Sequence, residues 1–195
     1  MLFQYDIRDV LFLYLLYNYL VEKIVGGSMY LKKLKMVGFK SFINPTEIEF
    51  TNEITGVVGP NGSGKSNIVD AVRWVLGEQS VKTLRGDGNM TDVIFTGSSS
   101  RPASNFASVC IVFDNSDRTL NIDYAEVSVK RTVYKTGENE YYINNEKCRL
   151  KDITNLFLDS RSSKESFNIV PQNKIDQILS EKPEERRVIF EDAAG

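Results

Sequence analysis

The sequence has no histidine and only two cysteines among its 195 residues. A chain without histidine lacks the commonest general base, and it excludes nucleophile–histidine pairs and histidine-ligated zinc. Cys110 and Cys148 stand far apart in segments that favour strands, so neither a CxxC metal site nor a disulfide framework is indicated. We expect two buried structural thiols in a reducing cytoplasm. Any chemistry must use carboxylates, lysine, arginine, amides or a metal held by oxygen.

The chain also lacks an excess of either charge, because 24 basic residues stand against 26 acidic ones and the net charge is -2. No global field draws such a chain to nucleic acid or to an acidic membrane, so any contact with DNA requires a local basic patch. A hydrophobic content of 42% and a charged content of 26% are typical of a globular chain with its own core. We expect one domain, or one domain with a smaller lobe.

The N-terminal stretch 1–28 contains an apolar and aromatic run, VLFLYLLYNYLV, at 10–21. The run is shorter than the ~20 residues that span a bilayer, and it lacks the polar face of an amphipathic anchor. A signal peptide is an alternative, although Asp6 and Asp9 stand where such a peptide needs basic residues. The preferred hypothesis is that Met29 is the true start and that the stretch before it is a misassigned extension. No association with a membrane is expected.

Patterns of apolar residues predict an α/β chain whose elements surround one glycine-rich turn. Alternating or clustered apolar residues predict strands at 30–37, 46–50, 54–58, 92–95, 106–114, 125–134, 140–143 and 166–170. Helical spacing predicts helices at 65–76, 150–158, 174–179 and from 183 onward. Turn signals at 136–137 and 144–145 join the middle strands into an antiparallel meander.

The clearest chemical signal is a phosphate-binding pattern, G-x-x-x-x-G-K-[ST], which is matched in full by Gly59, Pro60, Asn61, Gly62, Ser63, Gly64, Lys65 and Ser66. The pattern lies between an expected strand and an expected helix, which is the context it requires. Its glycines let backbone N–H groups point at an anion, and the helix N-terminus adds partial positive charge. Lys65 is expected to contact the β- and γ-phosphates of ATP, and Ser66 to ligate Mg²⁺. Asn67 completes the candidate nucleotide-binding set.

Around this pattern the chain resembles the heads of ABC-type ATPases, and more closely those of the SMC (structural maintenance of chromosomes) family. The resemblance is carried by ordered blocks: GFKSF at 38–42, GPNGSGKSN at 59–67, DAVRWVLGEQS at 70–80, LRG at 84–86, DVIFTG at 92–97, CRLKDI at 148–153 and KPEERRVIFEDAAG at 182–195. It covers essentially all of 29–195. It implies the N-terminal lobe of a P-loop ABC-type head, with a parallel or mixed core sheet and an antiparallel β meander, truncated before a coiled-coil arm.

The resemblance also implies that this lobe needs other parts. In the family a C-terminal lobe supplies the signature motif and the Walker B carboxylates, and two heads enclose two ATP molecules. Here no S-G-G-x pattern occurs, and the only apolar run that ends in an acid, 110–114, is followed by Asn115 instead of glutamate. We therefore expect ATP binding without turnover. The expected partners are the C-terminal lobe, a second head in a homodimer, a kleisin-type subunit and DNA, in the nucleoid-associated cytoplasm.

Two further catalytic candidates beside Lys65 follow from the resemblance alone. Gln172 is similar to the Q-loop glutamine, which ligates Mg²⁺ and orients the attacking water, and Arg85 is similar to an arginine that reaches the phosphates. Lysines 32, 33, 35, 40 and 82 are candidates for a strip that contacts the DNA backbone, with solvated strand edges as the alternative.

The segment around Gln172 departs from the family pattern, which has glycines at positions held here by Arg161, Ser163 and Asn173. A non-catalytic remnant of an SMC gene is therefore the main alternative. The head of a related ABC-type DNA-repair ATPase is a further one. A free-standing nucleotide kinase is disfavoured, because a lid with arginines is missing.

Overall fold

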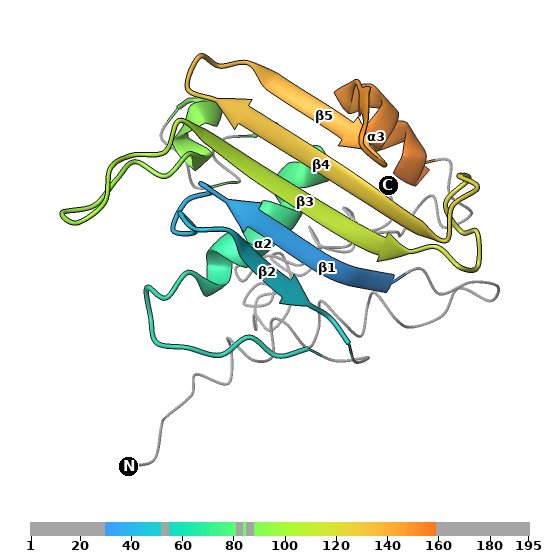
Figure 1. Cartoon of the computed structure of the whole chain (residues 1–195), viewed down its shortest axis with the longest axis horizontal. Coiled ribbons are helices and arrows are strands. Elements are labelled where there is room, and N and C mark those ends of the chain that lie inside the picture. Colours follow the sequence, from blue (N-terminus) through green and yellow to red (C-terminus); the bar gives the residue numbers. More distant parts are fainter. Residues whose placement is uncertain (1–29, 52–54, 81–83, 85–87, 159–195) are drawn as a thin grey trace, which may run out of the picture.

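The described part of the chain is built on a six-stranded antiparallel sheet (Figure 1). The structure is a computed structural model and describes residues 30–51, 55–80, 84 and 88–158. The strand order is β2-β1-β3-β4-β5-β6, and every neighbouring pair is antiparallel. The strands are β1 (Tyr30–Val37), β2 (Thr46–Glu49), β3 (Phe106–Asp114), β4 (Glu126–Tyr134), β5 (Asn139–Ile143) and β6 (Glu146–Cys148).

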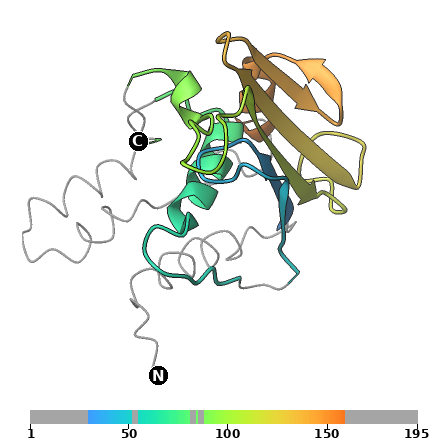
Figure 2. The same ribbon diagram turned by 60° about the vertical axis from the view of Figure 1, so that its left-hand side comes forward.

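Helices pack on one face of this sheet, as Figure 2 shows for the longest of them, α2. The helices are α2 (Lys65–Val75), the 3₁₀ helix η1 (Met90–Val93) and α3 (Leu150–Leu158). One apolar cluster joins Trp74 of α2 and Ile153 of α3 to Ile111 of β3. An edge-to-face contact between Phe113 and Phe157, with ring centroids 5.5 Å apart, places α3 against the end of β3. The sheet is therefore the support on which α2 rests.

The alternation of side chains along the strands separates this core from the outer face, which is the side of the sheet away from the helices. On β3, Val109, Ile111 and Phe113 are fully buried toward the helices, whereas Cys110 and Val112 between them lie half-buried on the outer face. The outer face is polar, because lysines and glutamates occupy the equivalent positions on the neighbouring strands.

Glu140 of β5 is the centre of one polar group on the outer face. Its carboxylate accepts hydrogen bonds from Lys147 Nζ at 3.0 Å, from Tyr134 Oη at 3.0 Å and from Tyr142 Oη at 3.2 Å. These donors, with Lys147 first, hold the pKa of Glu140 below its ordinary value. The same contact with Glu140 raises the pKa of Lys147. The group joins β4, β5 and β6 by side chains as well as by backbone.

Most of the predicted elements form. The predicted bounds hold for β1, β3 and α3, and α2 ends within one residue of its predicted end. The predicted turn at 144–145 joins β5 to β6, and Asn144 and Asn145 have φ angles of 48° and 68°. Asparagine tolerates this left-handed backbone better than most residues, which explains a tight hairpin at this point. The predicted antiparallel meander is thus confirmed from β3 to β5, and β6 continues it as a short strand that was not predicted.

The strand predicted before the phosphate-binding loop is not formed. Residues 55–58 have no strand pairing, and Val58 is 58% exposed. An extended segment becomes a strand only when a neighbour supplies backbone hydrogen bonds, and no described residue does so here. The predicted parallel or mixed core sheet is therefore not found in the described part of the chain, whose sheet is antiparallel throughout.

The strand predicted at 92–95 is also wrong. Met90–Val93 is a 3₁₀ helix, because Asn89 and Asp92 form a capping box that starts a helical turn. Ile94, just beyond it, makes only an isolated bridge with Phe39.

The cysteines are free thiols, as predicted, and both lie half-buried in strands. Burial raises the pKa of Cys110 and of Cys148, which disfavours the reactive thiolate. The predicted elements at 166–170, 174–179 and from 183 onward lie outside the described residues, as does the apolar run at 10–21. None of the helices described is long and apolar enough to cross a membrane.

Candidate nucleotide-binding site

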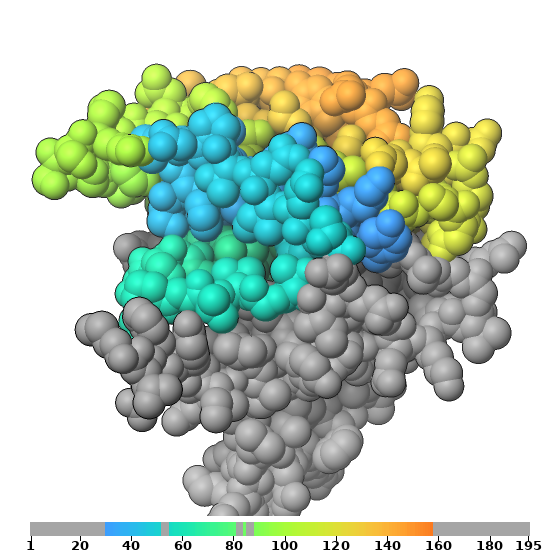
Figure 3. All heavy atoms as spheres, turned by 60° about the horizontal axis from the view of Figure 1, so that its bottom comes forward, coloured from blue at the N-terminus to red at the C-terminus, as the bar shows by residue number. Residues whose placement is uncertain are grey.

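The loop Gly59–Ser66 leads directly into α2 and lies open to solvent. Gly62 and Gly64 have φ angles of 80° and 92°, a backbone conformation that favours glycine. Asn61, Gly62 and Ser63 are exposed. In Figure 3 the blue-green atoms of this region lie on the molecular surface, below the blue atoms of β1 and β2. A ligand can therefore reach the loop directly.

Among the residues that the structure describes, no side chain caps the first turn of α2. Its N-cap residue, Gly64, makes no side-chain cap hydrogen bond, and the first turn contains no acidic residue. Helix N-termini usually carry a capping serine, threonine, aspartate or asparagine, because their first N–H groups lack partners within the helix. Without such a cap, the amides and the partial positive charge of this terminus suit an anion such as phosphate.

The Lys65 side chain folds back over the phosphate-binding loop. Its Nζ donates hydrogen bonds to the carbonyl oxygens of Gly59 at 2.7 Å and Pro60 at 3.1 Å. A lysine ammonium is a flexible point charge with three donors, so it can exchange carbonyl oxygens for phosphate oxygens without rearrangement of the backbone. The structure therefore brings the predicted lysine to the predicted loop.

Ser41 is a part of the site that sequence reasoning missed. A Cβ atom on Gly64 would lie 2.6 Å from Ser41 Oγ, so the serine and the loop are packed too closely for any residue but glycine. Ser41 Oγ also accepts a hydrogen bond from Asn67 Nδ2 at 2.9 Å. These contacts hold the start of α2 against the segment that follows β1.

A buried ion pair anchors the same segment to the middle of α2. Lys40 Nζ lies 2.6 Å from Asp70 Oδ2, and the two side chains are 13% and 6% exposed. Lys40 also donates to the backbone oxygen of Leu84, which is fully buried. The assignment of Lys40 to the DNA-contacting strip is therefore wrong, because its ammonium points into the protein. Arg85 lies outside the described residues, so its predicted phosphate contact stays a prediction.

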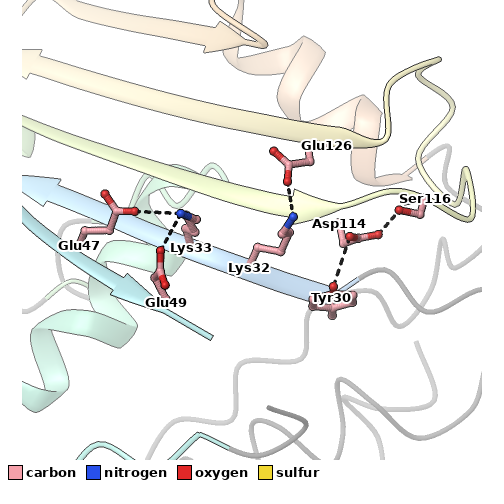
Figure 4. A network of polar contacts seen from close by, with 8 residues as sticks. All are labelled: Tyr30, Lys32, Lys33, Glu47, Glu49, Asp114, Ser116 and Glu126. Carbon is pink, nitrogen blue, oxygen red and sulfur yellow. Dashed lines mark hydrogen bonds and ion pairs between the residues drawn. The ribbon is translucent and has the colours of Figure 1, made fainter. Parts of the chain in front are cut away.

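The other described lysines of the predicted strip are paired with glutamates, and Figure 4 shows the pairs of Lys32 and Lys33. The strip carries three carboxylates for three lysines, so it is not a basic patch. The hydrogen bond to Glu126 raises the pKa of Lys32, and the bonds to Glu49 and Glu47 raise that of Lys33. Lys82 lies outside the described residues. The pairs are Lys32–Glu126, Lys33–Glu47, Lys33–Glu49 and Lys35–Glu47.

Asn115 follows the apolar run at 110–114, at the position where a catalytic glutamate would be needed. Its side chain is fully buried and holds the loop after β3 by hydrogen bonds. Its Nδ2 donates to the carbonyl oxygens of Leu120, Ile122 and Tyr124 at 3.2, 3.1 and 2.9 Å. Its Oδ1 accepts a hydrogen bond from the N–H of Leu120 at 2.8 Å. The amide is fully occupied by these contacts, and the run at 110–114 is part of β3. The prediction that this run is an ordinary strand is confirmed.

Comparisons with known proteins identify the family of the chain. A model of the RecF/RecN/SMC N-terminal domain matches residues 30–167. The chain belongs to this family. It is 58% identical over 167 residues to the chromosome partition protein Smc of Bacillus subtilis (strain 168), a match that covers 86% of this chain and 14% of that protein. The chain thus spans 14% of the length of the curated relatives it matches.

Two solved structures show that the fold is that of an SMC ATPase head. One, from work on ATP-driven dimerization and DNA-stimulated activation of SMC ATPases, matches with a TM-score of 0.73 and 36% identity and covers 85% of this chain and 99% of that chain. The other is the Pyrococcus furiosus Smc head domain with an extended coiled coil, bound to the C-terminal domain of ScpA. It matches with a TM-score of 0.69 and 38% identity, over 84% of this chain and 41% of that one.

The structure leaves part of the predicted site untested. Gln172 and the substituted positions 161, 163 and 173 lie outside the described residues, so the Mg²⁺ contact of Gln172 stays a prediction. Of the residues that sequence reasoning missed, Asp70 gave the clearest signal. It is the lone acid within the largely apolar and buried part of α2 at 68–75, and a buried acid needs a cation as its partner.

Proposed function

We propose that this chain is the ATP-binding N-terminal lobe of the head of a chromosome condensation and segregation ATPase that acts on DNA. One observation carries the proposal: the loop Gly59–Ser66 opens a helix whose first turn contains no acidic residue and, within the described part of the chain, no side-chain cap. Membership of a family that contains SMC ATPases supports the same function.

The loop residues divide the work of binding ATP. Backbone N–H groups of the loop would bind phosphate oxygens, and Lys65 would exchange the carbonyls of Gly59 and Pro60 for the β- and γ-phosphates. The exposed Ser66 hydroxyl would ligate Mg²⁺, which neutralises phosphate charge. The described residues include no group of three or more His, Cys, Asp or Glu that could hold a metal. The cation would therefore depend on Ser66, phosphate oxygens and water, with Gln172 as a further proposed ligand.

We further propose that this lobe binds ATP without turning it over. Its 195 residues contain no signature motif, and the only apolar run that ends in an acid, 110–114, is an ordinary strand followed by Asn115 rather than by glutamate. A C-terminal lobe and a second head would complete the site. A kleisin-type subunit is a proposed partner, because a similar Smc head is bound to the C-terminal domain of ScpA.

DNA is a proposed partner of the complete protein. The described lysines of β1 give this contact little support, because each is already paired with a glutamate. A phosphate backbone would have to displace those carboxylates, which is feasible because exposed ion pairs are worth only about 0–1 kcal/mol.

A non-catalytic remnant of an SMC gene is the second candidate. It is favoured by Arg161, Ser163 and Asn173, which replace glycines of the family pattern near Gln172. The downstream DNA separates the two candidates: continuous heptads after Gly195 favour the first, and an immediate stop favours the second.

The test is ATP binding and steady-state hydrolysis by the 195-residue chain with Mg²⁺. We expect binding without turnover, and Lys65→Ala should weaken binding by about 100-fold, because a charge-assisted phosphate contact is lost. Lys151→Ala is the matched control, since Lys151 is an exposed lysine of α3 and its loss should leave the affinity unchanged. Turnover that Lys65→Ala abolishes would overturn the claim of incompleteness. Failure of the unmodified chain to bind ATP would overturn the proposed function and favour the remnant.

A further inference from the structure

A buried arginine ties the sheet to the far end of the helix that carries the phosphate-binding loop. Arg131 lies on the helix-facing side of β4 and is 2% exposed. Its Nη1 donates hydrogen bonds to the carbonyl oxygens of Trp74 at 2.8 Å and Glu78 at 2.9 Å. These carbonyls lie in the last turn of α2 and just beyond it. The arginine therefore grips the end of α2 opposite to the loop.

The end of α2 is already closed by its own backbone. Gly77 has a φ angle of 117°, its N–H donates to Trp74 O at 3.3 Å, and the N–H of Glu78 donates to Arg73 O at 3.1 Å. This pattern is a Schellman motif, which satisfies the last carbonyls of a helix without help from a side chain. Arg131 adds a cation where the helix carries partial negative charge. Arg131 is therefore not needed to end the helix. Its contacts instead attach the end of α2 to the sheet.

The guanidinium of Arg131 also packs over aromatic rings. Its Cζ lies 4.6 Å from the ring centroid of Trp74 and 5.3 Å from that of Tyr141, within the range of a cation–π contact. Trp74 in turn packs against Phe39, with centroids 5.4 Å apart, and its Nε1 donates to Met90 Sδ. A continuous set of buried contacts thus runs from β4 through the end of α2 to the segment after β1.

Core packing alone does not explain a charged residue at this position. In the described part of the chain Arg131 makes no ion pair. Its guanidinium also contacts Asn139 Oδ1 at 3.4 Å and the side chain of Tyr141, and its Nε has no hydrogen-bond partner. Burial lowers the pKa of Arg131 below its ordinary value. A buried charge without a carboxylate partner is costly, and an apolar side chain of similar volume is often at least as stable. The charge therefore calls for a role other than stability.

We propose that Arg131 is a positioning residue for nucleotide binding, which holds the C-terminal end of α2 and thereby orients the phosphate-binding loop at its N-terminal end. This inference rests on the proposed function. Seven of the 11 residues of α2 are buried, and the helix is a rod about 16 Å long. A tilt at one end of such a rod displaces the amides at the other, and binding groups must be held to within about 0.5 Å.

The test compares Arg131→Met with two matched controls. Lys130→Met removes a cation from the adjacent position of β4, on the outer face, where Lys130 Nζ lies 5.4 Å from the ring centroid of Tyr142. Val127→Ala creates a cavity at a fully buried position of the same strand that lies outside the cluster around Trp74. The first control isolates the loss of charge, and the second isolates the loss of stability.

We expect Arg131→Met to raise the Kd for ATP by about tenfold, as for the loss of one or two hydrogen bonds to a charged group. Its unfolding temperature should fall less than that of Val127→Ala, and both controls should keep the native Kd. Arg131→Lys keeps the charge but cannot donate to both the Trp74 and the Glu78 carbonyl as Arg131 does, so its Kd for ATP should be intermediate. If Arg131→Met does not fold, Arg131→Lys is compared with the two controls instead. A native Kd in Arg131→Met, or an equal rise in Kd in Val127→Ala, would overturn the inference.

Hydrogen exchange separates this inference from the proposed function. If the unmodified chain binds no ATP, the proposed function fails, and Arg131 is judged by amide exchange at residues 59–68 in the free protein. Faster exchange there in Arg131→Met, but not in Val127→Ala, supports the positioning role. Equal rates in the two variants would overturn it.

Discussion

Asn115→Asp tests whether the residue after the run at 110–114 has a structural or a catalytic role. The substitution keeps the shape of the side chain but replaces the Nδ2 donor with a carboxylate oxygen. That oxygen would face the carbonyls of Leu120, Ile122 and Tyr124 at 2.9–3.2 Å, where Nδ2 now donates to all three. Three attractive contacts therefore become repulsive ones in a fully buried site.

The expected cost follows from these contacts. The two N–H donors of the amide are shared among the three carbonyls, so their loss at about 1 kcal/mol each gives about 2 kcal/mol, and burial of an unpaired charge adds to it. We therefore expect the free energy of unfolding to fall by about 4 kcal/mol at neutral pH, out of the roughly 5–15 kcal/mol of a typical domain. Burial raises the pKa of the introduced carboxyl above its unfolded value of about 4, so the folded state holds its proton to higher pH. The deficit should thus shrink as the pH is lowered from 7 toward 4.

The assay is urea unfolding of both forms at pH 7 and pH 4.5, monitored by circular dichroism. Asn121→Asp is the matched control, because Asn121 is exposed in the same loop and its change should stay within about 0.5 kcal/mol. ATP affinity of the folded Asn115→Asp protein should equal that of the native chain. Native stability at pH 7, or an affinity for ATP that changes without a loss of stability, would refute the structural role.

Two further predictions concern the loop and the outer face. Gly64→Ala should lower both the unfolding temperature and the affinity for ATP, because a Cβ would lie 2.6 Å from Ser41 Oγ on a backbone with a φ of 92°; Gly88→Ala, where a Cβ meets nothing within 4 Å, should change neither in the same titrations. Glu140→Gln should flatten the loss of stability in acid. The lowered pKa of Glu140 means that its stabilising effect is complete above the unfolded pKa and is lost as the pH falls through the folded one. Melting curves from pH 6 to pH 3 that match those of the native chain would contradict this, with Glu138→Gln as the exposed control.

The elements that sequence reasoning predicted correctly are those whose determinants are local. The bounds of β1 follow from alternation along eight residues, and the hairpin at Asn144 and Asn145 follows from the tolerance of asparagine for positive φ. The loop Gly59–Ser66 follows from a spacing that few other functions require. In each case the information lies within a few neighbouring residues.

The predictions that failed depend on contacts between distant segments. Residues 55–58 have a strand composition but no described partner, and pairing cannot be read from composition. Lys40 looked like the other lysines of its segment, yet it is paired with Asp70, thirty residues away. Arg131 follows Lys130 on β4, and the two basic residues differ only in the direction of their side chains. Arg131 points into the core and contacts α2, whereas Lys130 lies on the outer face. Such distinctions require the fold.

The residues that fix the position of α2 lie outside the phosphate-binding motif, so a motif search finds the loop but not the residues that position it. The helix is fastened near its start by Ser41, in its middle by Lys40 through Asp70, and at its end by Arg131. All three anchors come from β4 or from the segment that follows β1, and none belongs to the phosphate-binding pattern. If the anchors set the loop amides before ATP arrives, binding need not include the free-energy cost of ordering them. The antiparallel sheet would then contribute to nucleotide affinity as directly as the glycines do. The ATP titrations of Arg131→Met and Gly64→Ala measure these two contributions.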